Sequence, residues 1–520
     1  MQITTAAQSA QRDAGAIASG IDSWTLMHAA GQAAAQFVAE LATRVEASVI
    51  SVLAGSGNNG GDAYVVAAEL LHNDFTVVLY ATGEPRTEDA KRARDLYQTA
   101  RDAAGPSVDF VASEDDVRFV LVDGVLGTGQ TGELREPERE VTDRIARFRA
   151  FGGLVVALDI PTGVNATTGD IAEGAVQADY TLAFGTMKRA HVLQRGQCGE
   201  VTVLDIGLGE FADKDDGAWE LGDAQELAPL VPEIRWNAHK GTRGRLAIVG
   251  GNEGMAGAVV LASQAALHSG VGLVHAHVHG ASALALQISV PQAITHAWSD
   301  SGANESLAAM HAIAVGPGLG RSVQSSKTLS DLIAALPNVP LVLDADALTL
   351  LGADVEQLRA LCEHREVVCT PHVGEFARLI GKPAHETLEG RIAQAHELSD
   401  AMGATILLKG TPTIIVAPHE TTTTVVARGT PVLATGGSGD MLTGIVGTLL
   451  AQGVNGADAA AIGAYVHGRA AEIATENAGS IRGVTLQEVM ASLAAAWREF
   501  SISKLSSTDS EIVLTQLPAL

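Results

Sequence analysis

Short apolar runs that end in glycine or aspartate recur along the chain and constrain its fold more than any other feature. In the first half these runs occupy residues 48–54, 75–80, 119–123, 154–159, 180–184 and 201–206. Helix-like stretches precede or separate them, at about 8–41, 63–72 and 87–103. Strands that are apolar throughout, and that alternate with helices, predict a parallel sheet covered by helices on both faces.

The same pattern starts again in the second half, which predicts a second α/β domain. Its apolar runs occupy residues 245–249, 273–277, 312–315, 341–344, 366–370 and 405–408, and a strongly helical segment follows at 440–452. Between about 209 and 238 the pattern gives way to acidic, proline-containing sequence. We therefore expect a first domain at 1–215, a linker at 216–234, a second domain at 235–500 and a loose tail at 501–520.

Charge and composition exclude several classes of function. The formal net charge of −26 repels nucleic acid, and aromatic residues make up only 4% of the 520 residues, too few for a base-stacking surface. The three cysteines form no CxxC motif, which argues against a zinc site or a disulfide framework. No apolar run approaches membrane-spanning length. We expect a cytoplasmic protein with no nucleic-acid or membrane partner.

Three glycine-rich segments of the first half follow predicted strands. The segment 55–62 (GSGNNGGD) precedes a helix, so its backbone N–H groups can face a phosphate at the helix start, and Asp62 suits the helix N-cap. Asp123 and Asp159 each begin a similar loop, at 123–133 and 159–165. Because loops at the carboxyl ends of parallel strands converge, we expect the three to line one site. Asn59, Asp123 and Thr162 would offer oxygens to a hard cation, although each alone is more often a turn cap.

Together the three segments resemble the NAD(P)HX epimerase family, over roughly residues 1–215. Members of that family interconvert the epimers of hydrated NADH or NADPH on a Rossmann-like three-layer sandwich. The resemblance implies that Asn59, Asp123 and Thr162 bind K⁺ and that Asp159 contacts the reacting centre as a catalytic and substrate-binding residue. It also implies further substrate contacts from two segments: Asn58, Asn59, Gly60, Gly61 and Asp62, then Gly127, Thr128, Gly129, Gln130, Thr131, Gly132 and Glu133.

Two details of the first half bear on this interpretation. Lys188 is a candidate partner for phosphate, although an exposed lysine after a strand is the commoner case. The early helix reads Met27-His-Ala-Ala-Gly31, whereas the family usually has glutamate at the position of His28. This departure leaves open a first domain that only binds or oligomerises.

A small-residue loop opens directly into the helical segment of the second half. The sequence 434–444 (ATGGSGDMLTG) lets several N–H groups point at an anion, with the helix dipole behind them. Asp440 falls in the first helical turn, where it is either a favourable N-terminal acid or a base beside an anion hole. The second role is the one that phosphoryl transfer requires.

This loop resembles that of ribokinase-like kinases, and five further segments narrow the resemblance to ADP- or ATP-dependent NAD(P)HX dehydratases. They occur in the family's order at 250–258, 316–320, 343–348, 370–376 and 409–413. The resemblance, over about 235–500, implies Mg²⁺ and an ADP or ATP co-substrate, with Asp440 as catalytic base. Substrate contacts would come from Ala258, Gly318, His372 and Asp440, and nucleotide contacts from Lys409, Gly410, Thr411, Pro412, Thr413 and Gly439.

The two halves make chemical sense together, because one epimer serves the dehydratase and the first domain resupplies it. A ribokinase-like kinase of a vitamin or sugar would explain the second half but not the first. A dehydratase fused to a non-catalytic module remains the other alternative. We expect small-molecule substrates, NADHX or NADPHX with ADP or ATP, and a homo-oligomer.

Overall fold

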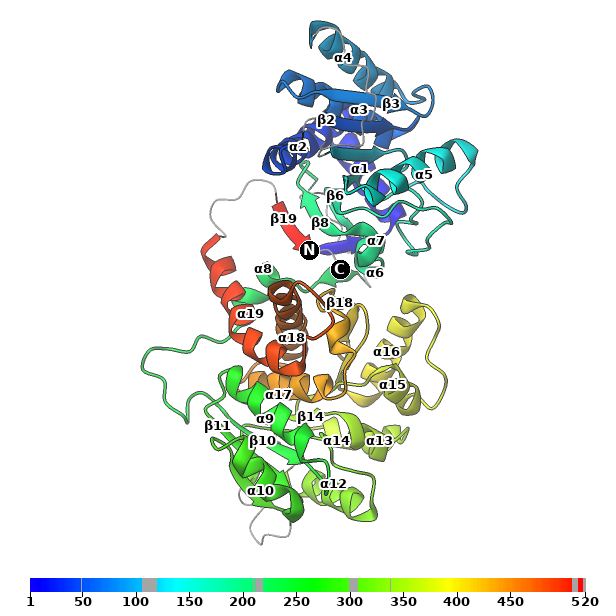
Figure 1. Ribbon diagram of the computed structural model, residues 1–520. Coiled ribbons are helices and arrows are strands. Elements are labelled where there is room, and N and C mark those ends of the chain that lie inside the picture. The colour runs from blue at the N-terminus through cyan, green and yellow to red at the C-terminus, as the bar shows by residue number, and fades with distance from the viewer. Residues whose placement is uncertain are drawn as a thin grey trace. The chain divides into compact units, whose positions relative to one another are not determined.

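The computed structural model describes residues 1–47, 49–104, 119–208, 211, 218–298, 307–336, 338–506 and 513–517. The chain forms two compact units, Met1–Asp215 with Asp509–Leu520, and Asp216–Thr508. Both are α/β, as the alternation of apolar runs and helices predicts (Figure 1).

A seven-stranded sheet forms the centre of the first unit, in the order β19-β8-β6-β5-β4-β2-β3. All neighbouring strands are parallel except β19 and β8. Outside this seven-stranded sheet, β1 pairs in parallel with β7. The strands are β1 (Gln2–Thr4), β2 (Val49–Ala54), β3 (Val77–Ala81), β4 (Phe119–Gly124), β5 (Leu154–Leu158), β6 (Tyr180–Phe184), β7 (Met187–Lys188), β8 (Glu200–Leu204) and β19 (Val513–Leu517).

Helices cover both faces of this sheet, which confirms the three-layer arrangement. Alternate strand residues enter different cores: Val120 and Val122 pack with α2, α3 and α4, whereas Leu121 packs with α5. Such alternation is what a pleated strand imposes on its side chains. The helices are α1 (Ala6–Ala18), α2 (Ser23–Arg44), α3 (Asn58–His72), α4 (Glu88–Ala104), α5 (Glu136–Ala150), α6 (Arg189–Leu193) and α7 (Arg195–Cys198).

The second unit has a larger mixed sheet, in the order β12-β11-β10-β13-β14-β15-β16-β17-β18-β9. It is parallel from β12 to β16, after which β17 pairs antiparallel with both β16 and β18. The strands are β9 (Trp219–Leu221), β10 (Arg245–Gly250), β11 (Leu273–Val278), β12 (Ile294–Ala297), β13 (Ala312–Val315), β14 (Leu341–Leu343), β15 (Val367–Cys369), β16 (Thr405–Leu408), β17 (Thr413–Val416) and β18 (Thr423–Val426).

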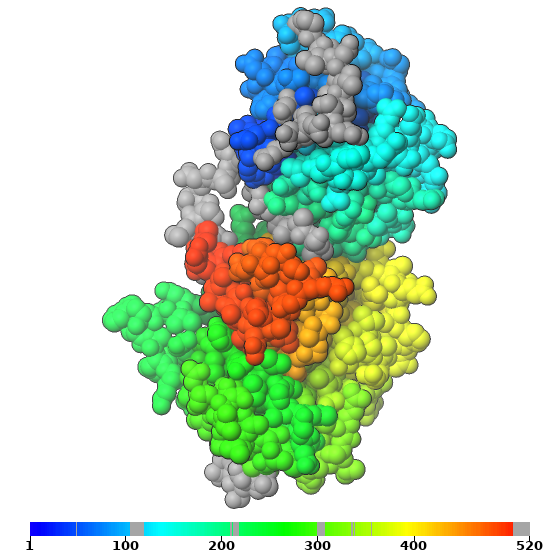
Figure 2. Space-filling model, viewed as in Figure 1, coloured from blue at the N-terminus to red at the C-terminus, as the bar shows by residue number. Residues whose placement is uncertain are grey.

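The main core of this unit packs α9, α17, α18 and α19 against the sheet. Figure 1 shows these helices lying together, and in Figure 2 the red surface of α19 adjoins the green surface of the α9 region. The helices are α8 (Ala224–Leu227), η2 (Ala228–Leu230), α9 (Ala256–His268), α10 (Gly280–Ser289), α12 (Val323–Ala335), α13 (Ala345–Leu351), α14 (Val355–Cys362), α15 (Val373–Leu379), α16 (Leu388–Met402), η3 (Pro431–Leu433), α17 (Ser438–Ala451), α18 (Gly456–Ala478) and α19 (Leu486–Ser506). Within the described ranges, no helix has the length and apolar content that crossing a membrane would need.

Two expectations about connecting segments are wrong. The predicted linker at 216–234 contains β9, α8 and η2, and β9 extends the second sheet by pairing with β18. The predicted loose tail begins too early, since α19 continues to Ser506 and β19 pairs with β8. Both segments are short or polar, so their structure depends on partners far away in the sequence and leaves little local signal.

Candidate active sites

The first unit has a cavity of about 630 Å³ at the carboxyl ends of its strands. The three predicted loops converge there, together with residues of α1, α2 and the segment that precedes α4. The predicted residues that line the cavity are Asn58, Asn59, Asp62, Gly127, Thr128, Gly129, Gln130 and Asp159.

The turn between β2 and α3 depends on a close backbone approach. A Cβ at Gly60 would lie 1.9 Å from the Gly55 carbonyl oxygen, and one at Gly61 would lie 2.6 Å from the Met27 sulfur. These two glycines therefore shape the turn from behind the cavity wall. Helix α3 begins at Asn58 after Gly57, so the prediction that Asp62 is the N-cap is wrong. Asp62 lies one turn inside the helix and reaches the cavity.

Asp159 is held rigidly at the end of β5. Its φ of 62° is unusual for a residue with a side chain, and such backbone persists only where the surroundings fix it. The Lys188 ammonium pairs with its carboxylate, and a ring nitrogen of His191 lies 2.8 Å from its carbonyl oxygen. Lys188 is 1% exposed, so the commoner case of an exposed lysine is wrong here. Burial lowers the pKa of His191 to about 4, so this ring is neutral near pH 7.

Two further carboxyl groups face the same cavity. Burial raises the pKa of Asp62 well above its usual value, and the charges of Asp159 and Asp13 raise it further. Asp13, on α1, also has a raised pKa, chiefly through burial. No sequence motif marks Asp13, because it is one polar residue among several on an amphipathic helix. The cavity thus combines one fixed ion pair with two carboxyl groups whose pKa values are raised.

The predicted cation ligands meet behind the cavity. Asp123 accepts hydrogen bonds from the Thr162 hydroxyl (2.7 Å) and the Thr162 N–H (2.9 Å). Asn59 donates from Nδ2 to the Leu126 carbonyl oxygen, and its Oδ1 is buried without a hydrogen-bond partner in the described structure. Buried polar atoms are rarely left unpaired, so this oxygen indicates a missing partner. A hard cation fits, because the three residues present oxygen atoms and a carboxylate.

The remaining predicted residues of the first unit lie farther out. Thr131, Gly132 and Glu133 follow the part of the loop that lines the cavity, and Glu133 accepts a hydrogen bond from the Glu173 N–H. His28 does not line the cavity either. Its ring packs against Trp24 and lies 3.7 Å from a carboxylate oxygen of Glu69, on α3. The exchange of glutamate for histidine therefore affects the packing of α2 on α3 and not the cavity wall.

In the second unit the small-residue loop of the segment 434–444, which we call the anion loop, leads into α17 as the sequence indicates. Gly437 is the N-cap, with a left-handed φ of 99°, and Asp440 lies in the first turn. A Cβ at Gly439 would lie 3.2 Å from Lys409 Nζ, so glycine leaves space between the loop and this ammonium. Backbone N–H groups and a lysine thus face the same point, as an anion-binding site requires.

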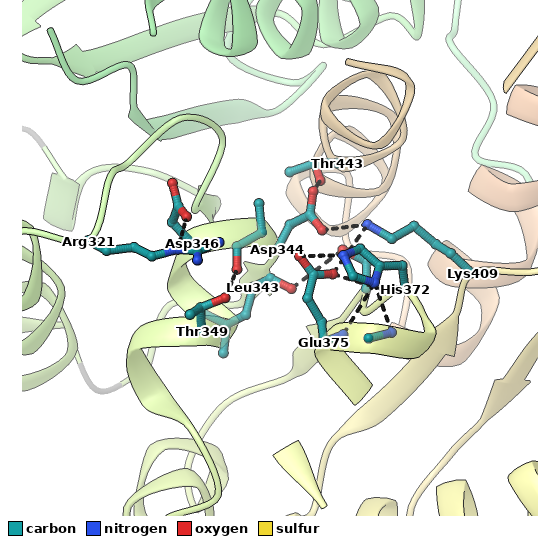
Figure 3. A network of polar contacts seen from close by, with 12 residues as sticks. Arg321, Leu343, Asp344, Asp346, Thr349, His372, Glu375, Lys409 and Thr443 are labelled. Atoms are coloured by element: carbon teal, nitrogen blue, oxygen red, sulfur yellow. Dashed lines mark hydrogen bonds and ion pairs between the residues drawn. The ribbon is translucent and has the colours of Figure 1, made fainter. Parts of the chain in front are cut away.

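Lys409 belongs to a network of polar contacts that Figure 3 shows. Its Nζ lies 2.8 Å from Asp344 and 4.0 Å from Glu375. Asp344 also accepts a hydrogen bond of 2.8 Å from Thr443, on α17, while Glu375 accepts one from the His372 N–H. Burial lowers the pKa of Lys409, but the three carboxylates Asp344, Glu375 and Asp440 outweigh it, so the pKa is raised. The ammonium is therefore charged and held in place.

Asp440, in the first turn of α17, is a candidate general base whose charge acts on Lys409. Burial raises its pKa to about 7, with the charge of Asp344 adding to the effect and that of Lys409 opposing it. A carboxylate with a pKa near the working pH is well suited to accept a proton in a reaction. Its protonation is therefore set by its burial and by charged groups from two separate strand ends, those of β14 and β16.

The other predicted residues surround this network from two sides. Gly318 packs closely on α9, since a Cβ there would lie 3.1 Å from that of Ala258. The predicted nucleotide contacts Gly410, Thr411, Pro412 and Thr413 form the turn between β16 and β17, directly after Lys409. His372 is the N-cap of α15, where its Nδ1 accepts the N–H groups of Gly374 and Glu375.

Asp344, Glu375 and Thr443 were not among the predicted site residues. Asp344 and Glu375 lie inside two of the quoted segments, 343–348 and 370–376, so a signal was present. Asp344 ends one predicted strand and Glu375 follows another, at positions where acidic side chains are also common as helix caps. Their role becomes visible only when β14, β15 and β16 are placed side by side.

Comparison with known proteins matches both halves. The NAD(P)H-hydrate dehydratase family matches residues 246–494, and the family described as YjeF-related protein N-terminus matches residues 23–190. The bifunctional NAD(P)H-hydrate repair enzyme Nnr of Coxiella burnetii is 33% identical over 477 residues, which cover 89% of this chain and 93% of that protein. The enzyme of the same name from Mycobacterium leprae is 34% identical over 470 residues, covering 90% and 93%.

Among solved structures, the ADP/ATP-dependent NAD(P)H-hydrate dehydratase of Bacillus subtilis, co-crystallised with ATP and Mg²⁺, is 27% identical. The alignment covers 54% of this chain and 98% of that one, with a TM-score of 0.47.

Proposed function

The chain belongs to the bifunctional NAD(P)H-hydrate repair enzymes. From this we propose which of its residues carry out each of the two reactions. It is an NAD(P)HX epimerase and a nucleotide-dependent NAD(P)HX dehydratase in one chain. We propose that the cavity of the first unit exchanges the epimers and that the Asp440 network of the second unit carries out the dehydration.

Asp159 is the proposed catalytic residue of the epimerase. In hydrated NAD(P)H the ring nitrogen lies beside the carbon that bears the hydroxyl group, so its lone pair can expel that group as water. A carboxylate there relays the proton and stabilises the transient iminium ion while water returns to the other face. Lys188 orients the Asp159 carboxylate and compensates its charge. The turn at Asn58–Asp62 and the loop at Gly127–Glu133 bind the rest of the substrate.

Asp440 is the proposed base of the dehydratase. It accepts the proton of the ring hydroxyl, whose oxygen attacks the terminal phosphoryl group of ADP or ATP and displaces AMP or ADP as the leaving group. The N–H groups of the anion loop and Lys409 stabilise the charge that develops on the phosphoryl oxygens. The ring nitrogen then expels phosphate, and loss of a ring proton restores the dihydronicotinamide. The observation that supports this most directly is Asp440 at the start of α17, whose raised pKa is opposed by the charge of the half-buried Lys409.

We propose K⁺ for the first unit and Mg²⁺ for the second. K⁺ would be held by Asn59, Asp123 and Thr162, where it would supply the missing partner of Asn59 Oδ1 and offset the Asp123 charge. Within the described residues no three acidic, histidine or cysteine side chains form a complete metal site. Mg²⁺ fits the second unit because, in nucleotide sites, it takes one or two carboxylates and completes its shell with phosphates. Asp344 and Glu375 are the proposed carboxylates.

The test is recovery of dihydronicotinamide absorbance from a mixed-epimer NADHX sample with Mg²⁺ and ADP, and with ATP in parallel. We expect full recovery, faster than spontaneous epimerisation measured without protein. Recovery that stalls at the fraction of one epimer would leave a dehydratase with an inactive first unit. Absence of recovery with either nucleotide would instead favour a ribokinase-like kinase. Light scattering on the same sample tests the expected homo-oligomer.

A further inference from the structure

Arg86 lines the cavity of the first unit, in the segment between β3 and α4. Its side chain is exposed, and in the described structure its guanidinium makes no hydrogen bond or ion pair. Its backbone N–H donates to the Ser56 carbonyl oxygen (2.9 Å), which ties this segment to the turn before α3. The other cation of the cavity wall, Lys188, is already paired with Asp159.

The order of the strands places Arg86 far from the reacting centre. Asp159 follows β5 and Arg86 follows β3, with β4 and β2 between them. Three strand spacings amount to about 14 Å. A dinucleotide with its ring at Asp159 and its pyrophosphate at the start of α3 therefore extends its adenosine half toward Arg86.

The same position distinguishes two kinds of dinucleotide in sheets of this type. The residue that follows the strand after the glycine turn meets the adenosine ribose, where an acid binds the free 2′-hydroxyl and an arginine binds a 2′-phosphate. Glu84, the nearest acid in the segment, pairs with Arg94 at 2.8 Å and does not line the cavity. Asp89 does line it and opposes a phosphate there. Arg86 is the group that can outweigh it.

We propose that Arg86 is a specificity-determining residue of the epimerase, which binds the 2′-phosphate of NADPHX and makes it a better substrate than NADHX. This rests on the proposed location of the epimerase site. A guanidinium suits the role because it presents paired donors to phosphate oxygens and stays charged at any working pH. Among the described residues that line the cavity, Arg86 is the cation without an ion pair, so in a chain of net charge −26 it is the group that can attract a phosphate there.

The test measures epimer exchange of NADPHX and NADHX by the full chain, without ADP or ATP so that the dehydratase is idle. We expect Arg86→Gln to lower kcat/KM for NADPHX about tenfold and to leave that for NADHX nearly unchanged, because one charge-assisted contact is lost. Arg86→Glu should reverse the preference. Arg92→Gln is the matched control, since Arg92 is an exposed arginine of α4 that lies over Trp24 and not in the cavity.

Three outcomes would overturn the proposal. Equal loss for both substrates would mean that Arg86 meets a group they share, such as the pyrophosphate. Unchanged kinetics with both substrates would mean that it contacts neither. Absence of exchange by the unmodified protein with either substrate would contradict the proposed epimerase site, and this inference with it.

Discussion

At the scale of single residues, each proposed site depends on a lysine, buried in the first unit and half-buried in the second, that pairs with a carboxylate at the end of a parallel strand. Lys188 pairs with Asp159 after β5, and Lys409 pairs with Asp344 after β14. A buried charge is tolerated only where it is paired and hydrogen-bonded, so these pairs are fixed before any substrate arrives. In the dehydratase the two charges of this pair also act in opposite directions on the pKa of Asp440, which burial raises.

The pH dependence of the dehydratase should follow Asp440. Because burial raises its pKa to about 7 and only the carboxylate form accepts a proton, the active fraction decreases as the pH falls below 7. We expect log kcat/KM for NADHX at saturating nucleotide to rise with a slope of about one up to pH 7 and then to level off. A profile that is flat between pH 5 and 8 would contradict the role of Asp440 as base. The epimerase rate, measured alongside, serves as the control.

The identity of the monovalent cation should matter to the epimerase alone. Replacing K⁺ with tetramethylammonium at constant ionic strength removes the partner proposed for Asn59 Oδ1 and leaves the Asp123 charge less compensated. We therefore expect epimer exchange to slow severalfold. Dehydration of the purified reactive epimer should keep its rate, because no K⁺ is proposed there. Equal epimer exchange in both salts would remove K⁺ from the first unit.

At the scale of secondary-structure elements, α18 holds the segment that leads to the anion loop. Glu472, which is 2% exposed, accepts hydrogen bonds from the Gly429 N–H (2.8 Å) and from Arg428 (3.3 Å), directly after β18. Arg469, one turn earlier on α18, pairs with the same carboxylate and with Glu476 and Glu499. The backbone path toward α17 is thus fixed by a buried ionic network.

Glu472→Gln should weaken both the fold and the reaction. The variant leaves Arg428 and Arg469 with less compensation in a buried environment, so we expect the free energy of unfolding of the second unit to fall by about 3 kcal/mol. Because the anion loop shifts, kcat should decrease more than the affinity for ADP. The measurements are urea unfolding, steady-state kinetics and calorimetric titration of ADP.

Glu476→Gln is the matched control for this variant, since Glu476 lies on the same helix and pairs with the same Arg469 but is 51% exposed. Its loss should cost less than about 1 kcal/mol. If both variants had the same effect on kcat, Glu472 would have no special role in positioning the loop.

At the scale of the whole molecule, the two proposed sites act in sequence on one diffusible substrate. Each unit has its own hydrophobic core, and the proposed catalytic aspartates lie one in each unit. The two activities should therefore be separable by single substitutions.

Variants that each lack one activity should complement each other in solution. Given mixed epimers of NADHX with Mg²⁺ and ADP, Asp159→Asn alone should stop after one epimer is consumed, and Asp440→Asn alone should give no recovery. A mixture of the two proteins should restore full recovery, because the epimer leaves one molecule and enters another. Full recovery at the normal rate by Asp159→Asn alone would show that this residue is not needed for epimer exchange.

The sequence by itself determined the features that depend on local backbone. Continuous apolar runs predicted the strands, and the glycines around Gly60 and Gly437 predicted the turns that open α3 and α17, because those turns need residues without a Cβ. The ordered motifs were sufficient to indicate both activities, and the comparisons confirm them.

Only the tertiary structure decided which charges meet. Lys409 and Asp344 are 65 positions apart, and Asp13 reaches the first cavity from a helix that carries no motif. The sequence favoured an exposed lysine at Lys188 over a phosphate partner and an N-cap role for Asp62 beside its predicted substrate contact. The exposed lysine and the N-cap are both wrong. The physical reason is that the burial and pairing of a charge depend on the order of strands in a sheet. Strand order is set by long-range packing, which a local sequence pattern does not show.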